Sequence, residues 1–113
     1  MPQISDFSET ERWTLQTTLD ERWGKGSVEL QLADAEIRLD PNDRELSTCP
    51  VAVWNVDGCG FALFKTGDKL YRCQFFYRGY QQYGTGIEEY SDIGECAVSL
   101  LQAQADHQSE QPK

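Results

Sequence analysis

Residues 51–80 constrain the fold more than any other part of the chain. Two dipeptides that tolerate a positive backbone φ, Asp57-Gly58 and Gly67-Asp68, each stand between segments rich in Val, Phe, Tyr and Leu. This arrangement is typical of two-residue loops in β-hairpins. The stretch is therefore predicted to form three consecutive antiparallel strands joined by two tight turns.

The two turns also predict which side chains share a face of this sheet. Loops at these dipeptides place Phe64 opposite Tyr71, and side chains alternate between the two faces along each strand. One face then carries no formal charge and is the predicted core face: Val51, Val53, Ala62, Phe64, Tyr71, Cys73, Phe75 and Tyr77. The other face places large aromatic residues beside two arginines: Ala52, Trp54, Phe61, Leu63, Arg72, Gln74, Phe76 and Arg78.

The size of the chain predicts one domain over residues 1–113. A chain of 113 residues and 12.9 kDa buries about two-thirds of its unfolded surface when it folds. Its hydrophobic core is therefore large enough to need neither a structural metal nor a disulfide framework. Residues 1–6 and 107–113 are expected to be flexible tails, because termini are usually poorly ordered unless they are tied down.

The charge of the chain disfavours two classes of partner. The net charge is −9 and the pI is near 4.4, which opposes binding to nucleic acid or to an anionic membrane surface. No apolar stretch approaches the roughly 20 residues that a membrane span needs. The first residues have neither a basic start nor an apolar segment, so no secretory signal is visible and a cytoplasmic location with reduced thiols is expected.

A first helix is predicted over residues 8–23. Ser8 and Glu11 stand at capping-box spacing, and Gly24 is a natural stop. Apolar residues follow at spacings that can share one stripe of the helix: Trp13, Leu15, Leu19 and Trp23. Both tryptophans are therefore expected to pack on the sheet.

The segment 27–40 alternates apolar and polar residues, but the alternation changes phase at Asp34-Ala35. A single regular strand would turn its last apolar residues to the wrong face, so either a hairpin or a bulge is needed there. We favour the hairpin. Residues 87–90 are predicted to form a further short strand.

Ser91 or Asp92 can cap a last helix, which is expected to fade near His107. The whole chain is thus predicted to be an α+β domain. Its antiparallel sheet would have about five strands, a hairpin plus the three-stranded meander, with an N-terminal and a C-terminal helix packed on one face.

No constellation typical of catalysis is visible. The four cysteines form no CxxC pair and the single histidine lies near the end of the chain, so no metal site and no cofactor are predicted. Nucleophile-elbow, phosphate-loop and zinc-protease motifs are absent from the sequence. Cys73 is expected to be buried, and Cys59, beside a turn, is expected to be the most exposed and reactive thiol. We therefore do not expect an enzyme.

The second sheet face is the candidate functional surface. Aromatic residues and arginines are enriched at protein interfaces. We expect a small acidic protein-binding or regulatory domain whose partner is another protein, or a second copy of the chain. The predicted contact residues are Trp54, Phe61, Arg72, Gln74, Phe76, Arg78 and Tyr80. In the alternative interpretation of this face, a helix covers it and its arginines pair with acids such as Glu9 or Asp92.

A second functional hypothesis is a small-ligand-binding domain or a small enzyme. Its pocket would lie between the sheet and the helices and would be lined by Tyr71, Tyr77, Tyr83 and Tyr90. A closed cavity with polar lining would favour the pocket, whereas an open aromatic patch would favour a protein partner.

Overall fold

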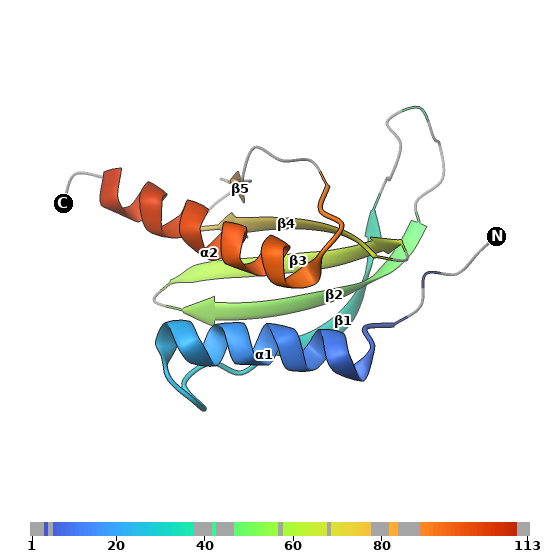
Figure 1. The fold of residues 1–113 in the computed structure, drawn as a ribbon. Coiled ribbons are helices and arrows are strands. Elements are labelled where there is room, and N and C mark those ends of the chain that lie inside the picture. Colours follow the sequence, from blue (N-terminus) through green and yellow to red (C-terminus); the bar gives the residue numbers. More distant parts are fainter. Residues whose placement is uncertain are drawn as a thin grey trace.

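The computed structural model of the chain is an α+β domain, an antiparallel sheet with two helices (Figure 1). The structure describes residues 4, 6–37, 42, 47–56, 58–67, 69–77, 82–83 and 89–110. The strands lie side by side in chain order: β1 (Gln31–Ile37), β2 (Ser47–Val56), β3 (Cys59–Gly67), β4 (Leu70–Phe76) and the two-residue β5 (Gln82–Tyr83). The helices are α1 (Glu9–Trp23) and α2 (Ile93–Glu110).

The predicted helix caps are confirmed. Ser8 Oγ accepts a hydrogen bond from the Glu11 backbone N–H at 3.1 Å, and Glu11 Oε1 accepts one from the Ser8 backbone N–H at 2.7 Å, which completes the capping box. Asp92 Oδ1 accepts the backbone N–H of Glu95 at 2.9 Å and begins α2. Because α2 runs to Glu110, the helix extends into the segment predicted as a tail.

The predicted hairpin at Asp34-Ala35 is wrong. β1 is one strand, and it pairs with β2 from Gln31↔Val53 to Ile37↔Ser47. Alanine has no preference for the turn conformations that Gly or Asn supply, so the dipeptide turns the chain poorly. Continuous pairing with residues 47–53 of β2 satisfies the backbone hydrogen-bonding groups instead.

The strand predicted at residues 87–90 lies partly outside the described residues. Residues 84–88 lie outside them, and only Tyr90 pairs with the sheet, through a single bridge to Tyr71. The fifth strand that the structure describes is β5, which pairs Tyr83 with Phe75.

The register predicted for the first hairpin is confirmed, whereas the register predicted for the second hairpin is wrong. β2 pairs with β3 from Val51↔Phe64 to Val56↔Cys59, as the turn at residues 57–58 predicts. In the second hairpin Phe64 lies opposite Arg72, because a register shift between Lys65 and Gly67 gives β3 an extra residue. A shift of one residue exchanges the faces of a strand relative to its neighbour.

Both helices lie on the same face of the sheet, where α2 packs against β4 and α1 packs beside α2 (Figure 1). The face that the helices cover is only partly the one predicted as the core face. The buried sheet residues in the main core are Ala52, Trp54, Cys59, Phe61, Leu63, Tyr71 and Phe75. The β4 half of the predicted core face is therefore correct, but Val51, Val53, Ala62 and Phe64 belong to the opposite face.

The two tryptophans of α1 have different environments. Trp23 packs edge-on against Phe61, with 5.6 Å between ring centroids, as predicted. Trp13 is 68% exposed, so its predicted packing on the sheet is wrong. Leu15 and Leu19, which are fully buried, supply the inner stripe of the helix. Within the described part of the chain, neither helix has the length and apolar character needed to cross a membrane.

Candidate functional site

The sheet divides the predicted partner-binding residues between its two faces. Trp54 is 1% exposed and Phe61 is fully buried, and their stacked rings, 5.4 Å apart, lie in the core beneath the helices. Neither side chain is presented to a partner. Arg72, Gln74 and Phe76 lie on the other face, and the predicted contacts Arg78 and Tyr80 fall outside the described residues.

We call this other face the open sheet face, because no described helix lies over it (Figure 1). Its half-buried side chains include Val53, Phe64, Arg72, Gln74 and Phe76. Val51 and Ala62 are buried between them but do not belong to the main core. Arg72 and Phe76 of the predicted surface therefore do lie on this face. Val53 and Phe64 take the places that were predicted for Trp54 and Phe61, which are buried in the core.

Phe76 is seated directly on the backbone of β3. A Cβ atom at Gly60 would come within 2.3 Å of Phe76 Cε2, so the ring occupies the space that a side chain would need. Gly60 lies opposite Phe76 in the β3–β4 ladder. The glycine therefore allows the aromatic ring to lie close to the sheet.

Arg72 is ion-paired at the edge of the open sheet face. Its Nε lies 3.6 Å from Glu89 Oε2, and both side chains are partly exposed. The same carboxylate oxygen accepts a hydrogen bond from Thr66 Oγ1 at 3.3 Å. The sequence suggested a pair with Glu9 or Asp92, and the structure pairs the arginine with Glu89.

A buried polar network joins α1 to the sheet. Lys65 Nζ donates hydrogen bonds to Glu11 Oε1 at 2.8 Å and to the Asp6 carbonyl oxygen at 3.1 Å, and the Tyr71 hydroxyl donates to Glu11 Oε2. Burial alone would raise the pKa of Glu11, but these hydrogen bonds and the one from Ser8 outweigh it and hold the pKa below its ordinary value. Sequence reasoning missed this network, although Lys65 was the only charge within the apolar run of β3.

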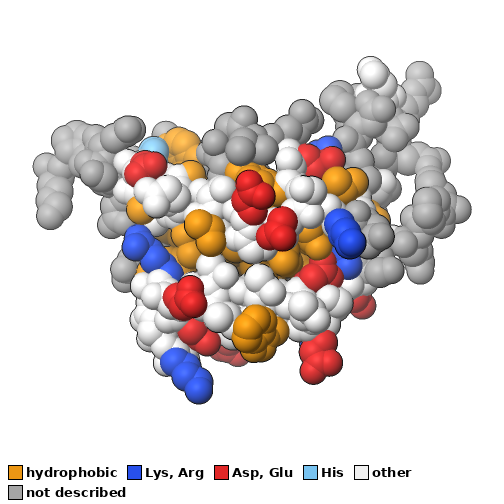
Figure 2. All heavy atoms as spheres, viewed as in Figure 1, with side chains coloured by type: hydrophobic (Ala, Val, Ile, Leu, Met, Phe, Trp, Pro, Cys, Tyr) orange, Lys and Arg blue, Asp and Glu red, His pale blue; other side chains and the backbone are white. Residues whose placement is uncertain are grey.

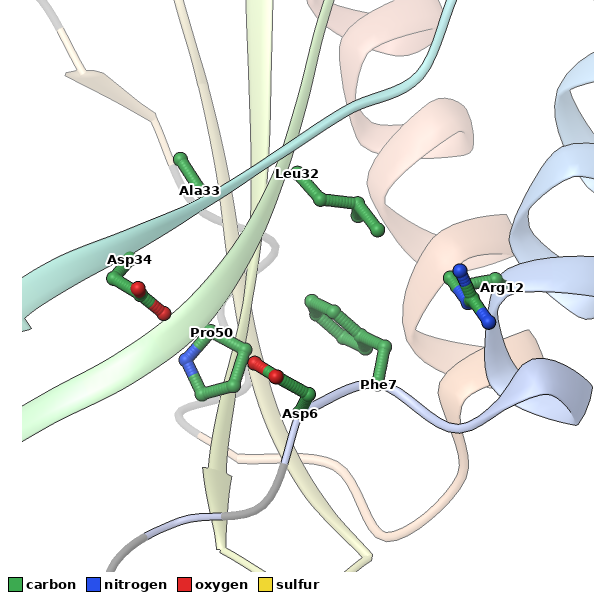
Figure 3. A pocket seen from close by; sticks show the side chains of 7 residues that line it. All are labelled: Asp6, Phe7, Arg12, Leu32, Ala33, Asp34 and Pro50. Carbon is green, nitrogen blue, oxygen red and sulfur yellow. The ribbon is translucent and has the colours of Figure 1, made fainter.

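A cavity of about 320 Å³ lies where the start of α1 meets β1 and β2 (Figure 3). Its lining residues come from four segments of the chain: Asp6, Phe7, Arg12, Leu32, Ala33, Asp34 and Pro50. Asp6 and Asp34 flank Pro50, Arg12 stands on the opposite side, and Phe7 and Leu32 lie between them (Figure 3). The hydrogen bond from Lys65 to the Asp6 carbonyl fixes one wall.

A smaller hollow of about 220 Å³ lies between the two helices on the outer surface. Its lining combines apolar and polar side chains from both helices: Thr18, Glu21, Arg22, Val98, Leu101, Gln102 and Ala105. Acidic and basic side chains surround the apolar atoms on this side of the molecule (Figure 2). Its lining holds one acidic and one basic side chain, Glu21 and Arg22, so it does not favour a ligand of either charge.

The four tyrosines of the predicted pocket form two separate pairs. Tyr71 and Tyr90 bridge at the start of β4, and both are buried. Tyr77 and Tyr83 meet near its end, 6.3 Å apart, where both rings contact His107 of α2. Neither of the two cavities described above is lined by a tyrosine.

The burial of Cys59 and Cys73 differs from the prediction. Cys59 is buried, and burial raises its pKa. Cys73 is only half-buried, and a hydrogen bond from the Cys96 thiol lowers its pKa. The same contact, together with burial, raises the pKa of Cys96. The most reactive thiol is therefore expected to be Cys73 rather than Cys59.

Among the described residues, no group of three His, Cys, Asp or Glu side chains is placed to hold a metal ion. No protein-family model, curated protein or solved structure matches the chain.

Proposed function

We propose that this protein is a small, non-catalytic binding domain that docks another protein on its open sheet face. The observation that carries the proposal is the placement of both helices on one side of the sheet. Apolar groups from β2, β3 and β4 consequently gather on the other side, where the described residues include no covering element. Partly exposed apolar surface of this kind is typical of interaction sites.

The side chains on this face favour binding over catalysis. Val53, Phe64 and Phe76 offer apolar contact area, while Gln74 and Arg72 offer hydrogen-bond donors. None of these side chains is of a type that commonly serves as a catalytic nucleophile or general base. The surface therefore suits recognition of an apolar partner surface with a few polar contacts.

The charge of the protein favours a basic partner. At a net charge of −9, the domain attracts a positively charged protein over long range and repels a second copy of itself. We therefore expect a partner whose contact surface is apolar at its centre and basic at its rim. Its association rate should fall as salt screens the attraction.

A matched pair of substitutions tests the proposal. Gln74→Arg adds bulk and positive charge at the centre of the open sheet face, and Gln102→Arg makes the same change on exposed α2. A photo-crosslinking amino acid in place of Phe64 identifies which protein contacts the face. Partners from the native cell are quantified by mass spectrometry for each variant.

We expect crosslinks from position 64 to one protein, and at least tenfold lower recovery of that protein with Gln74→Arg but not with Gln102→Arg. Equal recovery with both variants would refute the docking surface. A concentration-dependent dimer in sedimentation experiments, lost with Gln74→Arg, would instead assign the face to a second copy.

A further inference from the structure

The outer edge of β1 is a second surface with unused bonding capacity. β1 is the first strand of the sheet, and among the described residues it pairs only with β2. Its side chains from Gln31 to Asp34 are exposed, including the apolar Leu32 at 47%. An edge strand presents unpaired backbone N–H and C=O groups that can accept a further strand.

The cavity described above opens directly beside this edge, since Leu32, Ala33 and Asp34 of β1 form one of its walls (Figure 3). Its volume of about 320 Å³ lies at the lower limit of small-molecule pockets, which span about 300–1,000 Å³. It therefore suits one long side chain better than a complete cofactor. Proteins that bind extended peptides combine these two features, since backbone pairing gives affinity and a side-chain pocket gives specificity.

The charges of the cavity favour a basic side chain. Two carboxylates, Asp6 and Asp34, stand on either side of Pro50 at one end, and one guanidinium, Arg12, stands across the cavity (Figure 3). An ammonium or guanidinium group at the carboxylate end would make charge-assisted hydrogen bonds, and its aliphatic stem would lie between Phe7 and Leu32.

The same charges disfavour a second copy of the chain as the added strand. β1 carries Asp34 and Glu36 but no lysine or arginine. Two copies paired edge to edge would bring like charges together, which destabilises cross-strand pairs. The complementary occupant is therefore a basic segment of a different protein.

We propose that an extended, basic segment of a partner protein adds to the outer edge of β1 and inserts a Lys or Arg side chain into the cavity, with its charged group at the end that carries Asp6 and Asp34. This site lies apart from the open sheet face. It does not depend on the function proposed above.

Three labelled peptides of about eight residues test the proposal by fluorescence anisotropy. The first alternates Lys with Thr or Val, the second has Glu at each Lys position, and the third keeps the Lys sequence but carries N-methyl groups on alternate backbone amides. The matched protein variants are Asp34→Asn in the cavity and Asp106→Asn at an exposed position of α2, which change the net charge equally.

We expect the native protein to bind the Lys peptide, and to bind the Glu and N-methylated peptides at least tenfold more weakly. Asp34→Asn should weaken binding about five- to tenfold, as expected for one charge-assisted hydrogen bond, while Asp106→Asn should leave it unchanged. Amide shifts in nuclear magnetic resonance spectra should concentrate in Gln31–Ile37 and at Phe7.

Three outcomes would overturn the proposal. These are equal binding of the Lys and N-methylated peptides, equal weakening by the two Asn variants, and no binding of the Lys peptide at millimolar concentration. The first two would indicate attraction by net charge alone. Gln74→Arg, on the open sheet face, should leave the affinity for the Lys peptide unchanged. This result would distinguish the β1 edge site from the open sheet face.

Discussion

The substitution Glu11→Gln tests the buried network that joins α1 to the sheet. It replaces one carboxylate oxygen with an amide group of the same size and leaves the Lys65 ammonium without its counter-ion. Only 7% of the Lys65 side chain and 12% of the Glu11 side chain are exposed, so water restores little of the lost interaction. The Asp6 carbonyl remains as an acceptor for the ammonium group.

The expected cost is about 3 kcal/mol of unfolding free energy. Removing one partner of a buried ion pair typically costs about 3–5 kcal/mol, and the lower end applies because both side chains keep some exposure and Lys65 keeps one hydrogen bond. For a domain of this size, a loss of about 3 kcal/mol lowers Tm by roughly 10 °C.

A double-mutant cycle with Lys65→Met, measured by urea unfolding, checks the origin of this cost. If the pair is coupled as the 2.8 Å contact implies, the double variant should lose at least about 1.5 kcal/mol less than the sum of the single variants. Additive losses, or a loss below about 0.5 kcal/mol for Glu11→Gln alone, would show that the network does not hold α1 to the sheet.

The pH dependence of stability gives an independent check on Glu11. Its pKa is lowered in the folded protein, so its contribution is fully present above the ordinary glutamate value of 4.5 and is lost as pH falls below that value. The native protein should therefore lose more stability than Glu11→Gln between about pH 5 and pH 3. Parallel stability curves for the two proteins would contradict this assignment.

Two further measurements follow from close contacts in the structure. Gly60→Ala should lower the unfolding free energy by about 1–3 kcal/mol, because the new methyl group meets the Phe76 ring. The same substitution should cost less in a Phe76→Leu background. Equal costs in both backgrounds would argue against that contact. Thiol labelling of the native protein should modify Cys73 first, because it is half-buried and a hydrogen bond from Cys96 lowers its pKa. The other three cysteines should react only on unfolding, and prompt labelling of two or more thiols would refute this order.

Local sequence signals predicted those elements whose bonding partners lie close along the chain. The capping box of Ser8 and Glu11, the stop at Gly24 and the first hairpin turn each depend on residues within a few positions of one another. Such signals do not depend on the remainder of the fold, so a reader of the sequence can identify them directly.

The candidate site was less predictable, because the side chains of β4 can be assigned to a face of the sheet only if the register of the second hairpin is known. One extra residue between Lys65 and Gly67 reverses the relation between β3 and β4, and no residue type in the segment announces it. Trp54 and Phe61 consequently lie under the helices, while Arg72 and Phe76 lie on the open sheet face.

The sequence by itself determined an α+β domain with two capped helices, an antiparallel meander and an acidic surface, since each of these depends on composition or on contacts between near neighbours. Only the tertiary structure decided that β1 is a single strand, which face the helices cover, and that Asp6 and Asp34 share a cavity. The reason is that these features follow from pairings between distant segments, where one residue of register changes which side chains meet.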